Sequence, residues 1–211
     1  MLTLSGIAGA NRERAINAAV SAIKRGDLVM LPTESVYALA TDPFSSRGVA
    51  AIRAAKGQPE GSPLPLMVPN AQTVQGIATG VTGTVDSLMQ AFWPGPMTLL
   101  LPSQPSLVWD LPAGLPVAVR MPIHPLTLAI LQRTGPMVVT AANAAGSRAP
   151  KSLDEAVEQL GDCASVGIDI GTLGDDEITS TVIDVTGVTP KVVREGALSV
   201  THLRELLPDL P

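Results

Sequence analysis

The sequence predicts one α/β domain, and three observations support this prediction. Short apolar runs bounded by glycine or proline alternate with amphipathic helical segments along the whole chain. No internal repeat, low-complexity tract or linker interrupts this alternation. The chain has 211 residues, of which 45% are hydrophobic, and this is enough for one sizeable core. We therefore expect a single domain over residues 1–211, with its core between about residues 10 and 207.

The stretch from residue 28 to residue 56 gives the clearest pattern in the chain, a strand followed by a polar loop and a helix. The apolar run Leu28–Leu31 is typical of a buried strand, which Pro32 ends because proline has no N–H to donate. A polar loop follows, and then a helix that Ser45 or Ser46 caps and that reaches Lys56. Ligands of open α/β sheets usually bind at such strand ends.

The other elements follow from the same criteria. The first helix is expected to stop at a glycine, Gly26, and a Ser-x-x-Glu capping box begins the helix before residue 160. The further strands are expected at residues 66–68, 97–101, 117–121, 137–142, 165–170, 181–185 and 191–194. The further helices are expected at residues 11–25, 71–77, 85–93, 126–133, 152–160 and 201–207.

Composition excludes several classes of function. A net charge of −5 disfavours a protein that binds nucleic acid mainly through charge, although a local RNA contact stays open. Cys163 is the only cysteine, so there is no intramolecular disulfide and no cysteine-based zinc site. His124 and His202 lie in no ligand motif, and we expect no metal bound by protein ligands. No apolar run is long enough to span a membrane, and the N-terminus is too weakly apolar for a signal peptide, so we expect a cytoplasmic protein without membrane contact.

Arg120 is the strongest candidate for a binding residue. It lies in an apolar strand, where arginine is rare without a partner. One interpretation is a buried ion pair with Glu34 or Asp184. The other is a carboxylate-binding fork, because a guanidinium can hold both oxygens of a carboxylate at once.

Lys56 and Arg53 lie one turn apart near a helix end. One interpretation is that both are solvated surface cations, which the helix dipole favours near a helix C-terminus. The functional alternative is that Lys56 faces a phosphate group. The hydroxyls of Thr33, Ser35 and Ser180 could make only local backbone bonds.

Three other polar residues have two interpretations each. Tyr37 could belong either to the core or to a ligand wall. Asn143 could be a turn-forming residue, and Arg194 a surface arginine at a strand end. The sequence has no P-loop and no G-x-S-x-G elbow, which favours chemistry by positioning and charge neutralisation rather than by a covalent nucleophile.

The loop sequence PTESVYALATD at residues 32–42 resembles the PTETVYGLG loop of the YrdC family, the threonylcarbamoyl-AMP synthases. Further segments that resemble the family follow in order and span nearly the whole chain. They are AKG at 55–57, FWPGPMT at 92–98, VAVRMP at 117–122, AN at 142–143, and STVID at 180–184 with R-x-G at 194–196.

The resemblance implies a twisted, mostly mixed sheet flanked by helices around a concave ligand cavity. It also implies synthesis of threonylcarbamoyl-AMP and pyrophosphate from L-threonine, bicarbonate and ATP, with Mg²⁺ accompanying ATP. The product would serve the N6-threonylcarbamoyladenosine modification of tRNA through a partner enzyme. By resemblance, Arg120, Ser35 and Ser180 bind threonine, and Lys56 and Asn143 are catalytic. The implied nucleotide-binding residues are Lys56, Gln58, Ser62, Ala141, Asn143 and Arg194, and the implied pocket wall is Thr33, Tyr37 and Met67.

The sequence departs from the family's K-x-R…S-x-N signature at two positions, with Gln58 in place of arginine and Ala141 in place of serine. Ser62 and Met67 replace an asparagine and a histidine, and Lys151 lies in the segment that is PSPT in the family. The losses cluster on the nucleotide side, where Lys151 could restore one charge. Two alternatives to the synthase therefore stay open: a YciO-like paralogue with weak or no synthase activity, and an RNA- or nucleotide-binding module on the same fold.

Overall fold

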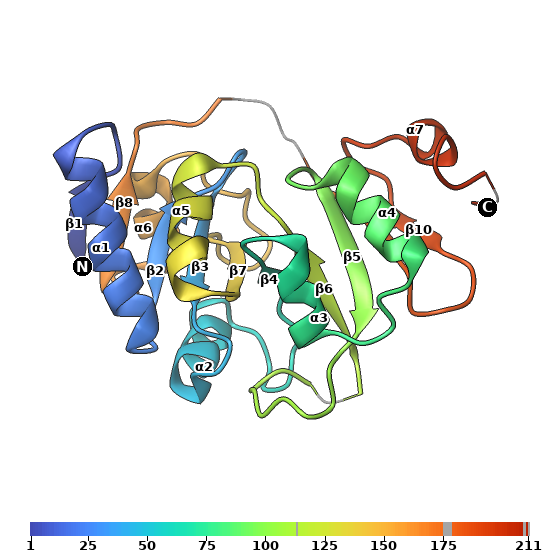
Figure 1. Cartoon of the computed structure of the whole chain (residues 1–211). Helices are drawn as coiled ribbons and strands as arrows, with labels where there is room; N and C mark the ends of the chain where they lie inside the picture. Colours follow the sequence, from blue (N-terminus) through green and yellow to red (C-terminus); the bar gives the residue numbers. More distant parts are fainter. Residues whose placement is uncertain (113, 175–178, 209, 211) are drawn as a thin grey trace.

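The computed structural model describes residues 1–112, 114–174, 179–208 and 210. Its strands form one sheet in the order β1-β8-β2-β3-β7-β4-β6-β5-β9-β10. Figure 1 shows this order, with β1 and β8 near one end of the molecule and β10 near the other. The sheet is mixed, because it contains parallel pairs such as β1 with β8 and β5 with β9 as well as antiparallel pairs such as β2 with β3.

The strands are β1 (Leu2–Ser5), β2 (Val29–Pro32), β3 (Tyr37–Thr41), β4 (Leu66–Met67), β5 (Met97–Pro102), β6 (Pro116–Arg120), β7 (Met137–Ala141), β8 (Val166–Asp169), β9 (Thr181–Asp184) and β10 (Lys191–Arg194). The helices are α1 (Ala10–Lys24), α2 (Ser46–Ala55), the 3-10 turn η1 (Ala71–Thr73), α3 (Val74–Ile77), α4 (Gly83–Phe92), α5 (Pro125–Thr134), α6 (Leu153–Leu160) and α7 (Val200–Arg204). The α/β prediction is confirmed, and each strand expected from the sequence is present within a few residues.

The expected path from strand through loop to helix is wrong in one respect. Residues 37–41 form β3, which pairs with β2 in a tight hairpin before α2 begins. Alanines at positions 38 and 40 hide the strand, because alanine is depleted in strands and gives weak alternation. Ser45 caps α2 as expected, since its side chain accepts a hydrogen bond from the N–H of Gly48.

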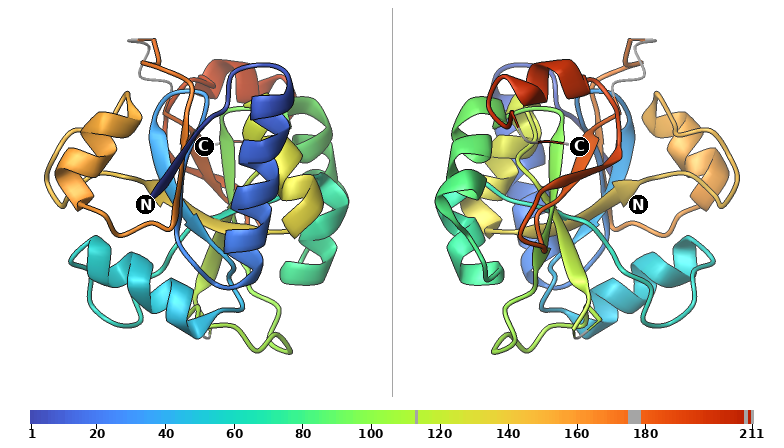
Figure 2. Two further views of the ribbon diagram at one scale, coloured as in Figure 1. Left: turned by 90° about the vertical axis from the view of Figure 1, so that its left-hand side faces the viewer. Right: turned by 90° about the vertical axis from the view of Figure 1, so that its right-hand side faces the viewer.

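Helices cover both sides of the sheet. Figure 2 shows α1 and α5 on one side of the molecule and α2 and α6 on the other, and these two pairs belong to different core clusters. The core consists mainly of aliphatic residues, and one of its clusters packs α1 and α5 against β2, β3, β7 and β8. A larger cluster joins α2, α3, α4 and α6 to other side chains of β2, β3 and β7 and to β4, β5, β6 and β9. This packing fixes the ends of β2, β6, β7 and β9, where the predicted site residues lie.

One face of β5, β6 and β9 is left partly open. Side chains alternate along β5, where Met97, Leu99 and Leu101 are buried and the residues between them are half-buried. The same alternation places Ala118 and Arg120 together on the half-buried face of β6. Arg120 therefore extends from the sheet toward a partly open surface, as a ligand-binding arginine must.

Candidate functional site

Arg120 joins three segments at the end of β6. Its Nη1 donates to the hydroxyl oxygen of Ser180 at 2.7 Å, and its Nη2 lies 2.6 Å from Oε1 of Glu34. The side chains of Arg120 and Glu34 are only 13% and 9% exposed. Burial lowers the pKa of the Arg120 guanidinium, and the Glu34 charge opposes this shift. The interpretation of Arg120 as the partner of a buried ion pair with Glu34 is thus confirmed. Its predicted role in carboxylate binding requires guanidinium N–H groups that Glu34 and Ser180 do not use.

Glu34 is only partly satisfied by this pair. The contact is a close ion pair rather than an aligned hydrogen bond, since neither carboxylate oxygen has a hydrogen-bond partner within the described part of the chain. The Glu34 charge also affects the pKa of His124, the residue that precedes α5. Burial lowers the pKa of His124, and this carboxylate raises it by a smaller amount. Glu34 therefore brings a negative charge and an unused acceptor to the end of β2.

Ser180 is fixed by a second arginine. Nε and Nη2 of Arg194 donate to the carbonyl oxygen of Ser180, at 3.2 and 2.8 Å. Gly196 permits this approach, because a Cβ there would lie 2.3 Å from the carbonyl oxygen of Thr179. The R-x-G segment thus holds the start of β9, and the exposed Arg194 lies near enough to Arg120 to affect its pKa.

Lys56 is buried against the end of β7 rather than solvated. Its Nζ donates to the carbonyl oxygens of Ala141 and Asn143, at 2.8 and 2.5 Å, and to Oδ1 of Asn143 at 2.7 Å. Burial lowers the pKa of the Lys56 ammonium. The surface interpretation of Lys56 is wrong, and the structure brings the two predicted catalytic residues into contact.

Arg53 is also buried, so the surface interpretation fails for both cations. Its guanidinium donates to the carbonyl oxygens of Ser62 and Asp110, and it pairs with the Asp110 carboxylate at 3.5 Å. Gln58 is exposed beyond the end of α2, and Ser62 bonds locally to Pro59. Arg53 therefore holds the segment that carries these two predicted nucleotide-binding residues.

Lys151 was expected at most to restore a charge on the nucleotide side. It is instead buried, and its Nζ donates to the carbonyl oxygen of Ser35 at 2.8 Å. Thr33 donates to the carbonyl oxygen of Val36, which is the local bond that one interpretation of this residue predicts. Lys151 and Thr33 thus shape the loop that carries Glu34 and Ser35, and Lys151 had no sequence signal beyond its place in the PSPT-like segment.

Two predicted pocket-wall residues belong to the core. Tyr37 is fully buried, and its hydroxyl donates to the carbonyl oxygen of Gly171 at 2.9 Å and accepts from the N–H of Ile170 at 3.0 Å. Met67 is 8% exposed and packs in the cluster beneath α1 and α5. For Tyr37 the structure supports the core interpretation, which the sequence had left open.

The Tyr37→Phe variant is expected to lose about 0.5–1.5 kcal/mol of unfolding free energy, because it removes the hydrogen bonds of the hydroxyl to Gly171 and Ile170. Burial, the main cause, raises the pKa of Tyr37 to about 12. The folded state therefore keeps the proton between pH 10 and 12 while the unfolded state loses it, and stability falls as pH rises through this range. Between pH 8 and pH 11, urea unfolding should show a Tyr37-dependent loss of roughly 1.4 kcal/mol, because one pH unit of the affected range lies below pH 11. An unchanged pH difference in Tyr37→Phe would contradict this assignment.

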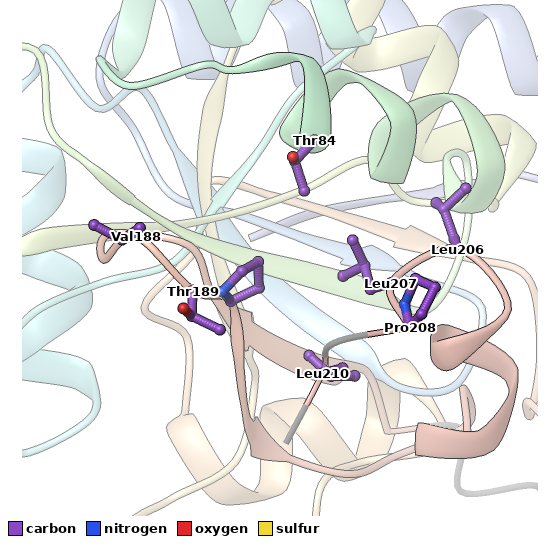
Figure 3. Close-up of a pocket in the computed structure, with 8 residues that line it drawn as sticks. Thr84, Val188, Thr189, Leu206, Leu207, Pro208 and Leu210 are labelled. Atoms are coloured by element: carbon purple, nitrogen blue, oxygen red, sulfur yellow. The ribbon is translucent and has the colours of Figure 1, made fainter.

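A separate pocket lies away from these residues. It has a volume of about 250 Å³ and is lined by Thr84, Val188, Thr189, Pro190, Leu206, Leu207, Pro208 and Leu210. Figure 3 shows it between the start of α4, the 188–190 turn and the segment after α7. None of these eight described lining residues is titratable, and none is a predicted site residue. Its composition therefore offers no group for the predicted chemistry.

The described part of the chain contains neither a metal-ligand cluster nor a membrane-spanning helix. Among residues 1–112, 114–174, 179–208 and 210, no group of three or more His, Cys, Asp or Glu side chains could hold a metal ion. Across the same residues, every helix is too short or too polar to span a membrane.

Known proteins match this chain over most of its length. The sequence model of the Sua5/YciO/YrdC family, described as "Telomere recombination", matches residues 21–196. A Mycobacterium tuberculosis protein named "Putative threonylcarbamoyl-AMP synthase" is 40% identical over 197 residues, which are 93% of this chain and 90% of that protein.

Solved structures show the same fold. Pyrococcus abyssi Sua5 complexed with L-threonine superposes with a TM-score of 0.87 at 30% identity, over 99% of this chain. This chain spans only 61% of the length of that protein. Escherichia coli YciO superposes with a TM-score of 0.77 at 26% identity, over 95% of this chain and 96% of that one.

Proposed function

We propose that this chain, which belongs to the Sua5/YciO/YrdC family, is a threonylcarbamoyl-AMP synthase. It would combine L-threonine, bicarbonate and ATP into threonylcarbamoyl-AMP and release pyrophosphate. This makes it a transferase of the nucleotidyl group. The observation that carries the proposal is the cluster of Arg120, Ser180 and Glu34 on a partly open sheet face, close to a second arginine.

Arg120 would bind the substrate carboxylate. A guanidinium has five N–H donors, and the described contacts of Arg120 use its two terminal nitrogens once each. Donors therefore remain for a carboxylate that approaches from the open face. Ser180, which Arg194 holds in place, and Ser35 at the end of β2 would contact the other polar groups of threonine.

Lys56, Asn143 and Arg194 would face the triphosphate. Lys56 now donates to three oxygens of the 141–143 segment, so it fixes the Asn143 side chain and brings one positive charge there. Threonine carbamate would attack the α-phosphorus, and pyrophosphate would leave. Mg²⁺ would arrive with ATP and offset phosphate charge when bound. Gln58, Ser62 and the Ala141 backbone would line the same side.

The synthase is favoured over the YciO-like paralogue and over a pure binding module. The Mycobacterium tuberculosis relative, which matches 93% of this chain, has a synthase name, and Sua5 superposes more closely than YciO. The net charge of −5 gives no support for bulk RNA binding. We further propose one domain over residues 1–211, a cytoplasmic location, and a tRNA-modifying enzyme as the consumer of the product.

Pyrophosphate release by the purified protein tests this proposal. The assay contains ATP and Mg²⁺, with bicarbonate and L-threonine each present or omitted. We expect release only when both are present. Release that needs neither would indicate simple ATP cleavage. No release, with threonine binding still detectable by calorimetry, would point to the paralogue.

The Gln58→Arg variant is expected to raise activity. Position 58 is exposed, so an arginine fits without repacking, and it would restore the charge of the family's K-x-R signature. A charge-assisted hydrogen bond to phosphate should lower the KM for ATP by about 10-fold or more. Gln90→Arg, an exposed substitution on α4, adds the same charge away from the site as a control. Equal effects of both variants would contradict a local role for position 58.

A further inference from the structure

We infer that Glu34 binds the α-ammonium group of the amino-acid substrate, so that Glu34 and Arg120 together recognise a zwitterion. This inference rests on the proposed function and deepens it. It adds a binding residue to the amino-acid side of the site, and it predicts discrimination against acids that lack the amine.

The first observation is an unsatisfied buried carboxylate. The Glu34 side chain is 9% exposed, and neither of its oxygens has a hydrogen-bond partner within the described residues. An ionised carboxylate accepts several hydrogen bonds, and leaving it without them in a buried position is costly. Oε1 is balanced by the charge of Arg120, whereas Oε2 has no cation within salt-bridge distance in the same described part.

The second observation is the place of this oxygen beside the proposed carboxylate site. Glu34 lies at the end of β2, and its Oε1 is 2.6 Å from Nη2 of Arg120. Nη1 of the same guanidinium meets Ser180. A ligand bound to the remaining donors of Arg120 thus has a negative charge close to it, and a buried carboxylate oxygen that has no hydrogen-bond partner among the described residues.

An α-amino acid fits this pairing of charges. Its carboxylate and ammonium are separated by one carbon, so a guanidinium and a carboxylate in direct contact can each meet the opposite charge of the ligand. An ammonium has three N–H donors, and one of them could supply the hydrogen bond that Oε2 of Glu34 lacks. A carboxylic acid with a hydroxyl in place of the amine offers no positive charge to Glu34 and should bind more weakly.

Calorimetric titration with two ligands tests the inference. The ligands are L-threonine and 2,3-dihydroxybutyrate of the same configuration, in which a hydroxyl replaces the α-amine. They are titrated into the full chain and into Glu34→Gln, which keeps the shape of the side chain and removes its charge. Glu158→Gln, an exposed change on α6, is the control for net charge. Comparing two ligands within one variant cancels any general loss of folded protein or of Arg120 positioning.

We expect the threonine Kd to rise by about 10- to 100-fold in Glu34→Gln, with the dihydroxybutyrate Kd within about 2-fold of its original value. A parallel loss for both ligands would overturn the inference and leave Glu34 as a support for Arg120. Unchanged or tighter threonine binding would also overturn it, and would show that Glu34 competes with the substrate for Arg120. No threonine binding to the unchanged protein would overturn it as well.

The proposed function fails separately. Threonine binding that depends on Glu34, without pyrophosphate release, would contradict the synthase and leave the zwitterion site intact. Pyrophosphate release with a threonine affinity that does not depend on Glu34 would support the synthase and contradict the zwitterion site.

Discussion

Replacement of Arg120 by alanine is expected to abolish threonine-dependent pyrophosphate release, with a loss of at least about 1,000-fold in kcat/KM for threonine. The variant removes the proposed carboxylate fork and the hydrogen bond to Ser180. It also leaves Glu34 buried without its only described ion-pair partner. Truncating one partner of a buried charge pair costs about 2–5 kcal/mol, and most of this cost reflects the remaining charge.

Two further variants separate binding from folding. Arg120→Lys keeps the charge but loses the planar fork, and it should lose about 10- to 100-fold in threonine affinity while remaining folded. The double variant with Arg120→Ala and Glu34→Gln should unfold at a higher temperature than Arg120→Ala alone, since the uncompensated charge is gone. An Arg120→Ala protein that is folded and fully active would contradict the assignment.

Replacement of Lys56 by methionine is the variant with the next largest expected effect. It removes three hydrogen bonds to the 141–143 segment and the positive charge proposed to face ATP. Methionine keeps most of the apolar stem, so the loss reflects the ammonium. We expect kcat/KM for ATP to fall by about 100-fold or more, because bonds to charged groups contribute roughly 1.5–3 kcal/mol each.

Hydrogen exchange distinguishes the two roles of Lys56. The amides of residues 142–147 should exchange faster in Lys56→Met if the ammonium fixes this segment. Lys24→Met is the matched control, because Lys24 is exposed at the end of α1. A normal KM for ATP together with faster exchange would restrict Lys56 to positioning Asn143 and would contradict a direct role in phosphate binding.

The fold was largely predictable because its strands are short apolar runs with glycine or proline at their ends. Two strands escaped prediction for physical reasons. β1 has only four residues, mostly exposed, and its pairing with β8 joins segments more than 160 positions apart. β3 alternates through alanines, and its burial comes from its neighbours β2 and β7 rather than from its own composition.

The candidate site was predictable by residue type but not by contact. Sequence favoured Arg120 because arginine in an apolar strand needs a partner, and Glu34 was among the partners considered. Lys56 was harder to place, because helical spacing puts it beside Arg53 and gives no hint that both are buried. The unsatisfied oxygen of Glu34 has no sequence signal at all, since it depends on where the loop after β2 meets the end of β6.

The most direct test of the synthase is mass spectrometry of the nucleotide product formed from ATP, L-threonine and ¹³C-bicarbonate. If the chain is a synthase, we expect an adenylate of threonine that carries one ¹³C atom, and no such product without threonine. An unlabelled threonyl adenylate, or AMP alone at the same rate with and without threonine, would contradict it.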